Sequence, residues 1–345
     1  MRVLVVTSGA LFVRGGHLVI AEETVSALIR CGHEAELLVT PQNRFGRQAS
    51  AYLATWLTDV GMTADGRPVD RVVSFRFPSY AVRHRQHVCW LNHRMREYYD
   101  LWNHFVRGLG RRGRLKEAVR RRLFHAADRW LLTRNVTRLL AQSRVVQQRL
   151  RRFGGIESEV LLPPPPELPY RTDGYDETIF AVSRLDRLKR IDLLVEAVGH
   201  APRGTLRARI AGEGPELDWL RKRVRALGIE RQIEFLGRIG DEQLVDELAR
   251  CRAVFFAPRD EDYGLVTLQA FRAGKAVVTG TDSGGPTELV RHGENGLIAA
   301  PTSEAMAEAL MELTMDKARA ERLGAQARED SREHTWERCV GELTR

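Results

Sequence analysis

Residues 261–269, EDYGLVTLQ, combine two side chains that can hold a polar ligand with a glycine between them. Glu261 can accept hydrogen bonds from hydroxyl groups, and the amide of Gln269 can both donate and accept. If a helix begins at the glycine, its first N–H groups can face an anion. A ligand with hydroxyl groups at both ends and phosphates in the middle, such as a nucleotide sugar, fits this spacing.

A second candidate anion site is the cationic segment SRLDRLKRID at residues 183–192. It follows a short apolar run and places Arg184, Arg187, Lys189 and Arg190 ahead of a predicted helix. Arginine can neutralise a diphosphate with a fork of donors, and lysine can do so as a point charge. The alternative is a group of surface cations that only cap a loop.

Gly15 and Gly16 stand before a helical pattern, where small residues let backbone N–H groups approach a phosphate. The pair lacks the Gly-x-Gly-x-x-Gly spacing that is typical of dinucleotide folds. This difference argues against a nicotinamide or flavin enzyme.

The elements that must carry these residues alternate along the chain. Residues 2–8 form a β-branched apolar run, residues 17–32 repeat apolar positions at three and four, and residues 34–40 form a second apolar run. This order of strand, helix and strand predicts a parallel sheet covered by helices. Further strands are predicted at residues 71–75, 87–91, 138–142 and 159–163.

Four prolines at residues 163–166 interrupt this pattern, because proline fits neither a helix interior nor a central strand. The alternation then restarts, which predicts a second α/β domain. Its strands are predicted at residues 179–183, 207–212, 233–237, 253–258, 276–280 and 296–300, and two of its helices at residues 215–228 and 241–251. Open parallel sheets bind ligands at the loops that follow their strands, and the candidate residues fall in such loops.

Length and composition set further bounds. A chain of 345 residues predicts two domains. No apolar run could span a bilayer, and the first residues lack the layout of a signal peptide, so we expect a cytoplasmic protein. The four cysteines are far apart in the sequence, which predicts buried thiols rather than a disulfide framework or a zinc site.

The formal net charge of +9 predicts attraction to anionic partners. The basic residues concentrate at 107–130, where Leu115, Val119 and Leu123 recur at helical spacing between arginines. Two interpretations stay open for this segment: the solvated face of a surface helix, or a surface that meets an anionic membrane. Nucleic acid is disfavoured, since two flanking tryptophans are too few to serve as stacking platforms.

Residues 260–301 resemble the donor-binding segment of the family 4 retaining glycosyltransferases, which have the GT-B fold. The signature of that family is a glutamate, seven residues and a second glutamate. Glu261 matches the first acid, whereas Gln269 stands at the second. The resemblance covers nearly the whole chain. Residues 7–38 resemble the amino-terminal glycine loop and helix of the family, and residues 181–198 resemble its Arg and Lys segment. Residues 87–102 and 139–166 are similar to a bacterial subgroup.

The resemblance implies an α/β protein of the GT-B class, with two Rossmann-like, doubly wound parallel-sheet domains facing across a cleft. Residues 1–164 would form the N-terminal domain that binds the acceptor. Residues 165–318 would form the C-terminal domain that binds the nucleotide sugar. Residues 319–345 would form a helical segment that returns toward the N-terminal domain.

The resemblance also implies roles for individual residues. The expected catalytic residues are Glu261, His93, Arg184 and Lys189, and the expected donor-binding residues are Gly15, Gly16, Arg184, Lys189, Glu261, Tyr263, Gly264, Leu265, Val266 and Gln269. No metal and no cofactor are expected, because the nucleotide sugar is a substrate and cations with helix N-termini stabilise the leaving diphosphate. The amide of Gln269 lacks the charge-assisted hydrogen bonds of a carboxylate, so we expect weaker donor binding more than slower chemistry.

The implied function is that of a metal-independent retaining glycosyltransferase, specifically a hexosyltransferase. It would move a hexose-type sugar from a UDP or GDP sugar to a glycan, lipid-linked or small-molecule acceptor. Two alternatives stay open: a non-catalytic sugar-nucleotide-binding homologue or partner subunit, which Gln269 favours, and a GT-B nucleotide-sugar epimerase. The expected location is the cytoplasm, and the basic segment 107–130 allows a peripheral contact with the inner face of the membrane.

Overall fold

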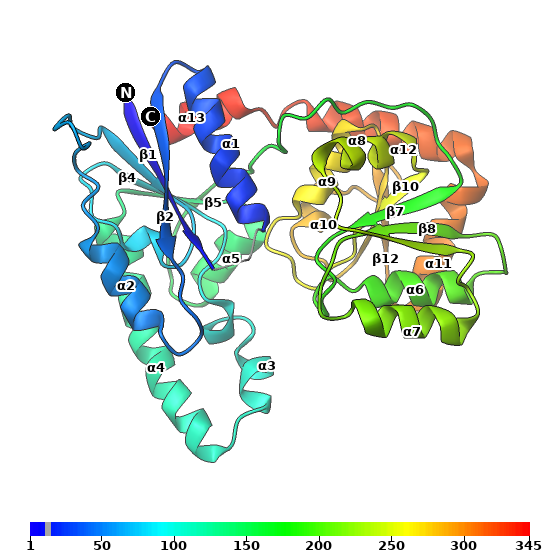
Figure 1. Cartoon of the computed structure of the whole chain (residues 1–345), viewed down its shortest axis with the longest axis horizontal. Coiled ribbons are helices and arrows are strands. Elements are labelled where there is room, and N and C mark those ends of the chain that lie inside the picture. The colour runs from blue at the N-terminus through cyan, green and yellow to red at the C-terminus, as the bar shows by residue number, and fades with distance from the viewer. Residues whose placement is uncertain (11–14) are drawn as a thin grey trace. The chain divides into compact units, whose positions relative to one another are not determined.

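The computed structural model describes residues 1–10 and 15–345, and these form two compact units (Figure 1). The N-terminal unit comprises Met1–Pro164 together with Thr335–Arg345, and the C-terminal unit comprises Pro165–His334. The boundary lies inside the run of four prolines. Of the expected terminal segment 319–345, residues 319–334 belong to the C-terminal unit and residues 335–345 to the N-terminal unit.

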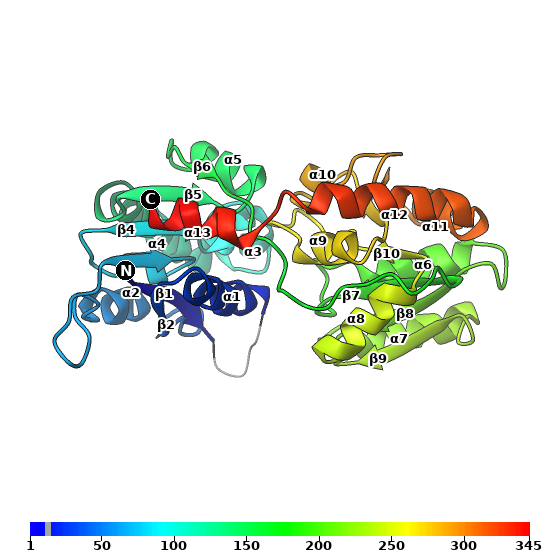
Figure 2. The ribbon, with the colours of Figure 1, turned by 90° about the horizontal axis from the view of Figure 1, so that it is seen from above.

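The N-terminal unit is built on a sheet of six parallel strands in the order β2-β1-β3-β4-β5-β6. Its strands are β1 (Arg2–Gly9), β2 (Glu34–Pro41), β3 (Arg71–Ser74), β4 (His87–Leu91), β5 (Arg138–Ala141) and β6 (Glu159–Val160). Its α-helices are α1 (Gly16–Arg30), α2 (Gln48–Leu57), α3 (Trp102–Arg107), α4 (Arg111–Trp130), α5 (Arg144–Arg152) and α13 (Trp336–Thr344). Short 3-10 turns lie at Ser79–Ala81 and Arg96–Tyr98, and a π-helical turn at Leu131–Asn135. Figure 2 shows α13 beside α1, so the end of the chain packs against its beginning.

Helix α4 is attached to the rest of this unit by its two acidic side chains. The hydroxyl groups of Tyr52, Tyr80 and Tyr99 all donate hydrogen bonds to the buried carboxylate of Asp128, at 2.5 Å for Tyr80 and 2.6 Å for Tyr99. Burial and this carboxylate raise the pKa of Tyr52 and Tyr80 well above the ordinary value. Glu117 is buried in the same way, against the Tyr98 hydroxyl at 2.6 Å. Both acids of the helix therefore face inward.

The C-terminal unit contains a second sheet of six parallel strands, in the order β12-β11-β10-β7-β8-β9. Its strands are β7 (Thr178–Val182), β8 (Arg207–Ala211), β9 (Ile233–Gly237), β10 (Ala253–Phe255), β11 (Val277–Gly280) and β12 (Gly296–Ala299). Its helices are α6 (Ile191–His200), α7 (Leu217–Leu227), α8 (Asp241–Arg250), α9 (Leu265–Arg272), α10 (Pro286–Leu289), α11 (Ser303–Met315) and α12 (Lys317–Ser331). In Figure 1, α6 and α7 lie on one side of the strands and α8 and α9 on the other.

The predicted α/β architecture is confirmed, and each predicted strand is present with small changes at its ends. Strand β6 covers only Glu159–Val160 of the predicted 159–163, since the prolines that follow cannot continue the ladder. Strand β10 ends at Phe255 because residues 256–258 already turn toward the loop.

Three of the four thiols are buried as expected, but Cys31 is exposed, because it caps the solvent-facing end of α1. Within the described part of the chain, no helix has the length and apolar character needed to cross a bilayer.

The buried His87 of β4 makes the stability of the N-terminal unit depend on pH. Its Nε2 lies 2.7 Å from the Ser74 hydroxyl, and burial lowers its pKa from 6.5 to about 3. An unfolded chain would bind a proton between these two values while the folded chain would not, so the free energy of unfolding should fall as the pH drops through this window. Denaturant unfolding at several pH values should show this fall, reduced in His87→Gln. His17, His33 and His125, whose pKa values are also lowered by burial, add to the fall in the native protein and in the variant.

The control for this experiment is His104→Gln, which changes an exposed histidine on α3. This variant should keep the pH dependence of the native protein. An identical pH dependence in His87→Gln and the native protein would contradict the burial argument.

Candidate functional site

The loops that follow four neighbouring strands meet at the carboxyl edge of the C-terminal sheet. Strands β11, β10, β7 and β8 lie side by side and run in the same direction. Their following loops are residues 281–285, 256–264, 183–190 and 212–216. The predicted cationic segment and the EDYG stretch therefore occupy adjacent positions on this edge.

Two of the predicted residues form an ion pair at this edge. The Lys189 ammonium lies 2.7 Å from the Glu261 carboxylate, and each side chain retains about a fifth of its exposure, 23% and 21%. The Phe256 ring lies 5.8 Å from the same ammonium. Lys189 and Glu261 are 72 positions apart in the sequence, and the fold brings them into contact.

Two other predicted cations of the segment, Arg184 and Arg187, are exposed, and each lies near a carboxylate. Arg184 is 64% exposed and pairs with Asp186 at 2.7 Å, so it remains available at the surface of the loop. Arg187 is 85% exposed and lies 3.4 Å from Glu216. Asp186 also accepts hydrogen bonds from the N–H groups of Leu188 and Lys189, which shapes the loop around the lysine.

Arg190 is a structural residue rather than a surface cation, which corrects its expected grouping with the diphosphate-binding cations. It adopts a left-handed backbone conformation with φ of 50° and is 8% exposed. Its guanidinium binds both carboxylate oxygens of Asp282, at 2.7 and 3.0 Å, and donates to the carbonyl oxygens of Ala257 and Pro258. One side chain thus connects the loops after β7, β10 and β11.

The backbone of Glu261 is fixed by the glycines of the loop after β11. Its N–H donates to the Ser283 carbonyl and its carbonyl accepts from Gly285, both at 2.9 Å. Gly284 has φ of 72°, and a Cβ there would lie 2.5 Å from the Glu261 carbonyl oxygen. A Cβ on Gly285 would lie 2.3 Å from the carbonyl oxygen of the buried Tyr263. Only glycine permits this approach.

Helix α9 begins at the predicted glycine. Gly264 is its N-cap, with φ of 92°, and a Cβ there would lie 2.8 Å from the Pro286 ring. No residue in the described parts of the chain accepts a hydrogen bond from the N–H of Leu265 or Val266. These donors stand at the positive end of the helix.

Gln269 lies one turn further along α9 and is only 7% exposed. Its side-chain amide makes no hydrogen bond to the residues that the structure describes. A nearly buried amide of this kind costs free energy unless a ligand or water completes its hydrogen bonds.

Sequence reasoning missed Gly212 and Gly214, which follow β8. A Cβ on Gly212 would lie 1.8 Å from the Ser183 carbonyl oxygen, and one on Gly214 would lie 2.2 Å from that of Leu185. The Gly-Glu-Gly sequence directly after a strand was the available signal. These glycines let the loop after β8 support the cationic loop.

The remaining predicted residues lie in the N-terminal unit, at the carboxyl edge of its own sheet. Gly15 is the N-cap of α1 and Gly16 its first residue; residues 11–14 of the predicted glycine-bearing loop fall outside the described residues. His93 follows β4, and its Nδ1 donates to the Arg94 carbonyl oxygen at 2.6 Å. This contact places a proton on Nδ1.

Sequence reasoning also missed His17 and Arg76, which share this edge of the N-terminal unit. His17 lies in the first turn of α1, and Arg76 follows β3. Burial, and then the nearby Arg76 and His93, lower the pKa of His17 to about 3. The carboxyl edge of this sheet thus gathers basic side chains from three neighbouring strand ends.

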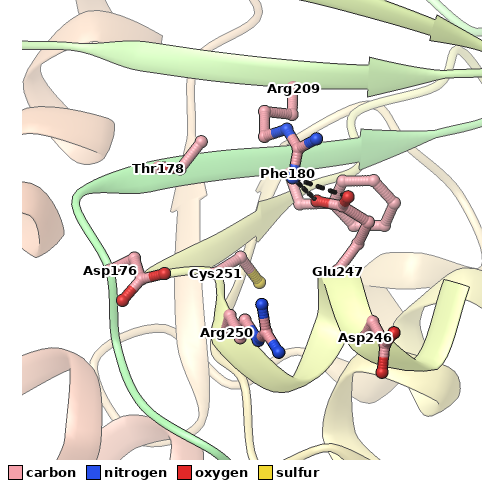
Figure 3. Close-up of a pocket in the computed structure, with 8 residues that line it drawn as sticks. All are labelled: Asp176, Thr178, Phe180, Arg209, Asp246, Glu247, Arg250 and Cys251. Atoms are coloured by element: carbon pink, nitrogen blue, oxygen red, sulfur yellow. Dashed lines mark hydrogen bonds and ion pairs between the residues drawn. The ribbon is translucent and has the colours of Figure 1, made fainter. Parts of the chain in front are cut away.

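A separate polar pocket of about 120 Å³ lies at the opposite, amino-terminal edge of the C-terminal sheet (Figure 3). Its walls are Asp176, Thr178, Phe180, Arg209, Asp246, Glu247, Arg250 and Cys251. Figure 3 shows Arg209 directed at Glu247, with which it pairs at 2.6 Å. The three carboxylates outnumber the two guanidinium groups, so this pocket does not suit a diphosphate.

A known protein family matches the part of the chain that carries the residues at this carboxyl edge. Residues 169–330 match the model of the family described as glycosyl transferases group 1. The C-terminal unit is a group 1 glycosyl transferase domain. The match includes the cationic loop, the EDYG stretch and the loop after β11.

Curated relatives match a little less than half of the chain. An exopolysaccharide phosphotransferase of Streptomyces coelicolor is 35% identical over 159 residues, which are 45% of this chain and 17% of that protein. A GDP-mannose-dependent α-(1-6)-phosphatidylinositol monomannoside mannosyltransferase of Mycobacterium tuberculosis is 34% identical over 166 residues, 45% of this chain and 43% of that protein. The chain thus spans less than half the length of these relatives.

Solved structures resemble the whole chain. Anabaena HepE in complex with UDP and glucose has a TM-score of 0.71 at 17% identity and covers 99% of both chains. The glycosyltransferase WaaG, involved in lipopolysaccharide biosynthesis, has a TM-score of 0.72 at 16% identity and covers 100% of both. At these identities the likeness shows the fold, which is that of the GT-B glycosyltransferases.

Replacing Arg190 by lysine should destabilise this group 1 glycosyl transferase domain. Lysine keeps the charge but cannot span two carbonyl oxygens and both oxygens of Asp282. We expect a loss of about 1 to 3 kcal/mol in the free energy of unfolding, measured by denaturant titration. The matched control is Arg187→Lys in the same loop, which should change stability by less than about 0.5 kcal/mol. Equal stability of the two variants would contradict the structural role of Arg190.

Proposed function

We propose that this protein is a retaining glycosyltransferase that moves a hexose-type sugar from a UDP or GDP sugar to a glycan, lipid-linked or small-molecule acceptor. The observation that carries the proposal is the Lys189–Glu261 pair, 2.7 Å apart beside the first turn of α9, within a group 1 glycosyl transferase domain. This arrangement offers a cation and backbone donors for phosphates, with a carboxylate next to them for sugar hydroxyls.

The donor diphosphate would contact Lys189, Arg184 and the N–H groups of Leu265 and Val266. A diphosphate that enters this edge would draw the Lys189 ammonium toward itself and leave Glu261 to accept hydrogen bonds from the transferred sugar. As the glycosidic bond breaks, negative charge develops on the leaving diphosphate, and the same donors stabilise it. The proposed mechanism uses no protein nucleophile, no metal and no cofactor.

Gln269 would bind the ribose of the donor. The amide has one acceptor oxygen and an NH2 that must donate, so one ribose hydroxyl accepts instead of donating. The nearly buried amide has no partner among the described residues and would gain one in the complex. Tyr263 and Gly264 would shape the site around the nucleotide through the backbone.

The N-terminal unit would bind the acceptor, with His93, Gly15 and Gly16 contributing at its carboxyl edge. We also propose a cytoplasmic location and a peripheral contact between the basic segment 107–130 and an anionic membrane, because the exposed charges of α4 are all positive.

A second candidate function, a non-catalytic sugar-nucleotide-binding homologue or partner subunit, is favoured by Gln269 alone. It requires binding without turnover. An epimerase of the same fold would convert one nucleotide sugar into another without releasing the nucleotide.

The release of nucleoside diphosphate from a panel of UDP and GDP sugars tests the proposed function, with membranes or glycans supplied as acceptors. We expect release from one donor class, and a loss of roughly 10- to 100-fold in kcat/KM for Glu261→Gln, because a charge-assisted hydrogen bond to the sugar is lost. The matched control is Glu230→Gln, which changes an exposed acid in the loop after α7 and should leave kcat/KM unaltered. Isomerised donor without release would indicate the epimerase instead.

Replacing Gln269 by glutamate should tighten donor binding. The carboxylate can accept from two ribose hydroxyls, which is worth about 1 to 2 kcal/mol, or roughly 5- to 30-fold in affinity. We expect a lower KM for the donor with a smaller change in kcat, measured from initial rates. An unchanged KM would contradict a contact between residue 269 and the nucleotide, and binding without turnover in both forms would favour the non-catalytic function.

A further inference from the structure

Helices α2 and α4 of the N-terminal unit expose apolar side chains that a folded surface normally buries. Both helices are labelled in Figure 1. On α4, Leu115 is 71% exposed and Leu123 is 66% exposed. On α2, Leu53 is 58% exposed and Leu57 is 65% exposed. An apolar patch of this kind on a soluble surface marks an interaction site.

Between the two helices lies a groove of about 490 Å³. Its walls are Ala49, Tyr52, Leu53 and Trp56 from α2; Arg120, Leu123, Phe124, Ala127 and Trp130 from α4; and Ala81 and Leu131 from the adjoining turns. We refer to these residues as the α2–α4 groove. Tyr52 stacks on Phe124, and Trp56 lies 5.5 Å from Trp130, so aromatic rings form much of the lining.

Two polar side chains of the groove, Tyr52 and Arg120, are already paired within the protein. The Tyr52 hydroxyl donates to Asp128, and the Arg120 guanidinium pairs with Glu117 at 3.0 Å and donates to Gly46 and Gln48. A peptide or a sugar would therefore lose its own hydrogen bonds with water on entering and find few replacements. A hydrocarbon chain loses none, so its entry is favoured by burial of apolar surface alone.

The surroundings of the groove are cationic. Because Glu117 and Asp128 face inward, the exposed charges of α4 are basic: Arg111, Arg112, Arg114, Lys116, Arg122 and Arg129, with Arg120 and Arg121 partly exposed. Five of these, Arg111, Arg112, Lys116, Arg122 and Arg129, have no ion pair or side-chain hydrogen bond within the parts of the chain that the structure describes. Arg83 lies over the Trp56 ring at 5.0 Å.

We propose that the α2–α4 groove binds a hydrocarbon chain of an anionic lipid, with the surrounding arginines on the lipid headgroups. This proposal rests on the membrane contact proposed above and adds the site and the chemical class of the ligand. Charge complementarity selects the membrane over a protein partner, because a bilayer supplies many anions without a fixed register and apolar chains without hydrogen-bonding groups.

The test uses the intact protein and vesicles made of phosphatidylcholine and phosphatidylglycerol in equal parts, with bromine on the acyl chains. Bromine quenches tryptophan fluorescence at short range, and Trp56 and Trp130 line the groove. We expect flotation with these vesicles, quenching by the brominated chains, and loss of most of that quenching in the Trp56→Phe/Trp130→Phe variant.

A matched pair of variants separates the groove from the rest of the helix. Leu53→Gln/Leu123→Gln changes two exposed residues of the groove wall, and Leu115→Gln/Val119→Thr changes two exposed residues outside it. The first variant should lose most of the quenching while still floating, and the second should keep it. Because all four residues are exposed, thermal unfolding should be unchanged in both.

Flotation also separates this proposal from the membrane contact on which it rests. Arg122→Gln/Arg129→Gln should reduce vesicle affinity by roughly 10-fold or more, with the quenching per bound protein unchanged. Flotation without chain quenching, or equal quenching in the two leucine variants, would overturn the groove and leave the membrane contact. Absence of flotation would overturn both, and neither result depends on glycosyl transfer.

Discussion

The guanidinium of Arg190 connects the three loops on which the candidate donor site depends. It binds Asp282 after β11 and the carbonyl oxygens of Ala257 and Pro258 after β10, while its own backbone begins α6 after β7. An arginine that is 8% exposed is stable only with its donors paired, and its planar fork can reach all of these acceptors at once. The adjacent residue, Lys189, is thereby directed to Glu261 at the surface of the same edge.

The two neighbouring cations illustrate how burial separates a structural charge from a charge that a ligand could reach. Arg190 makes four hydrogen bonds and holds the loops, whereas Lys189 keeps a fifth of its exposure and has one carboxylate partner that a diphosphate could replace. The same separation occurs on α4, where the acids Glu117 and Asp128 face the interior and the cations face outward. In both places the fold leaves positive charge available to an anionic ligand.

The sequence was sufficient to predict the alternating strands and helices, because the strands are short apolar runs and several of their boundaries carry glycine or proline. It also identified Lys189 and Glu261, which the structure brings into contact. It could not show which of Arg184, Arg187, Lys189 and Arg190 faces inward, since that depends on the left-handed conformation at Arg190 and on a partner, Asp282, 92 positions away. The inward acids of α4 were equally hidden, because apolar periodicity predicts an apolar inner face. The Gly-Glu-Gly at 212–214 carried a signal that could have been used.

We propose that a nucleotide binds at the carboxyl edge of the C-terminal sheet, against Lys189, Glu261 and the first turn of α9. Calorimetric titration of the intact protein with UDP and with GDP tests it most directly. We expect saturable binding of one of them, in the micromolar to sub-millimolar range, and weaker binding by Lys189→Met. Binding of neither nucleotide by the folded protein would contradict it.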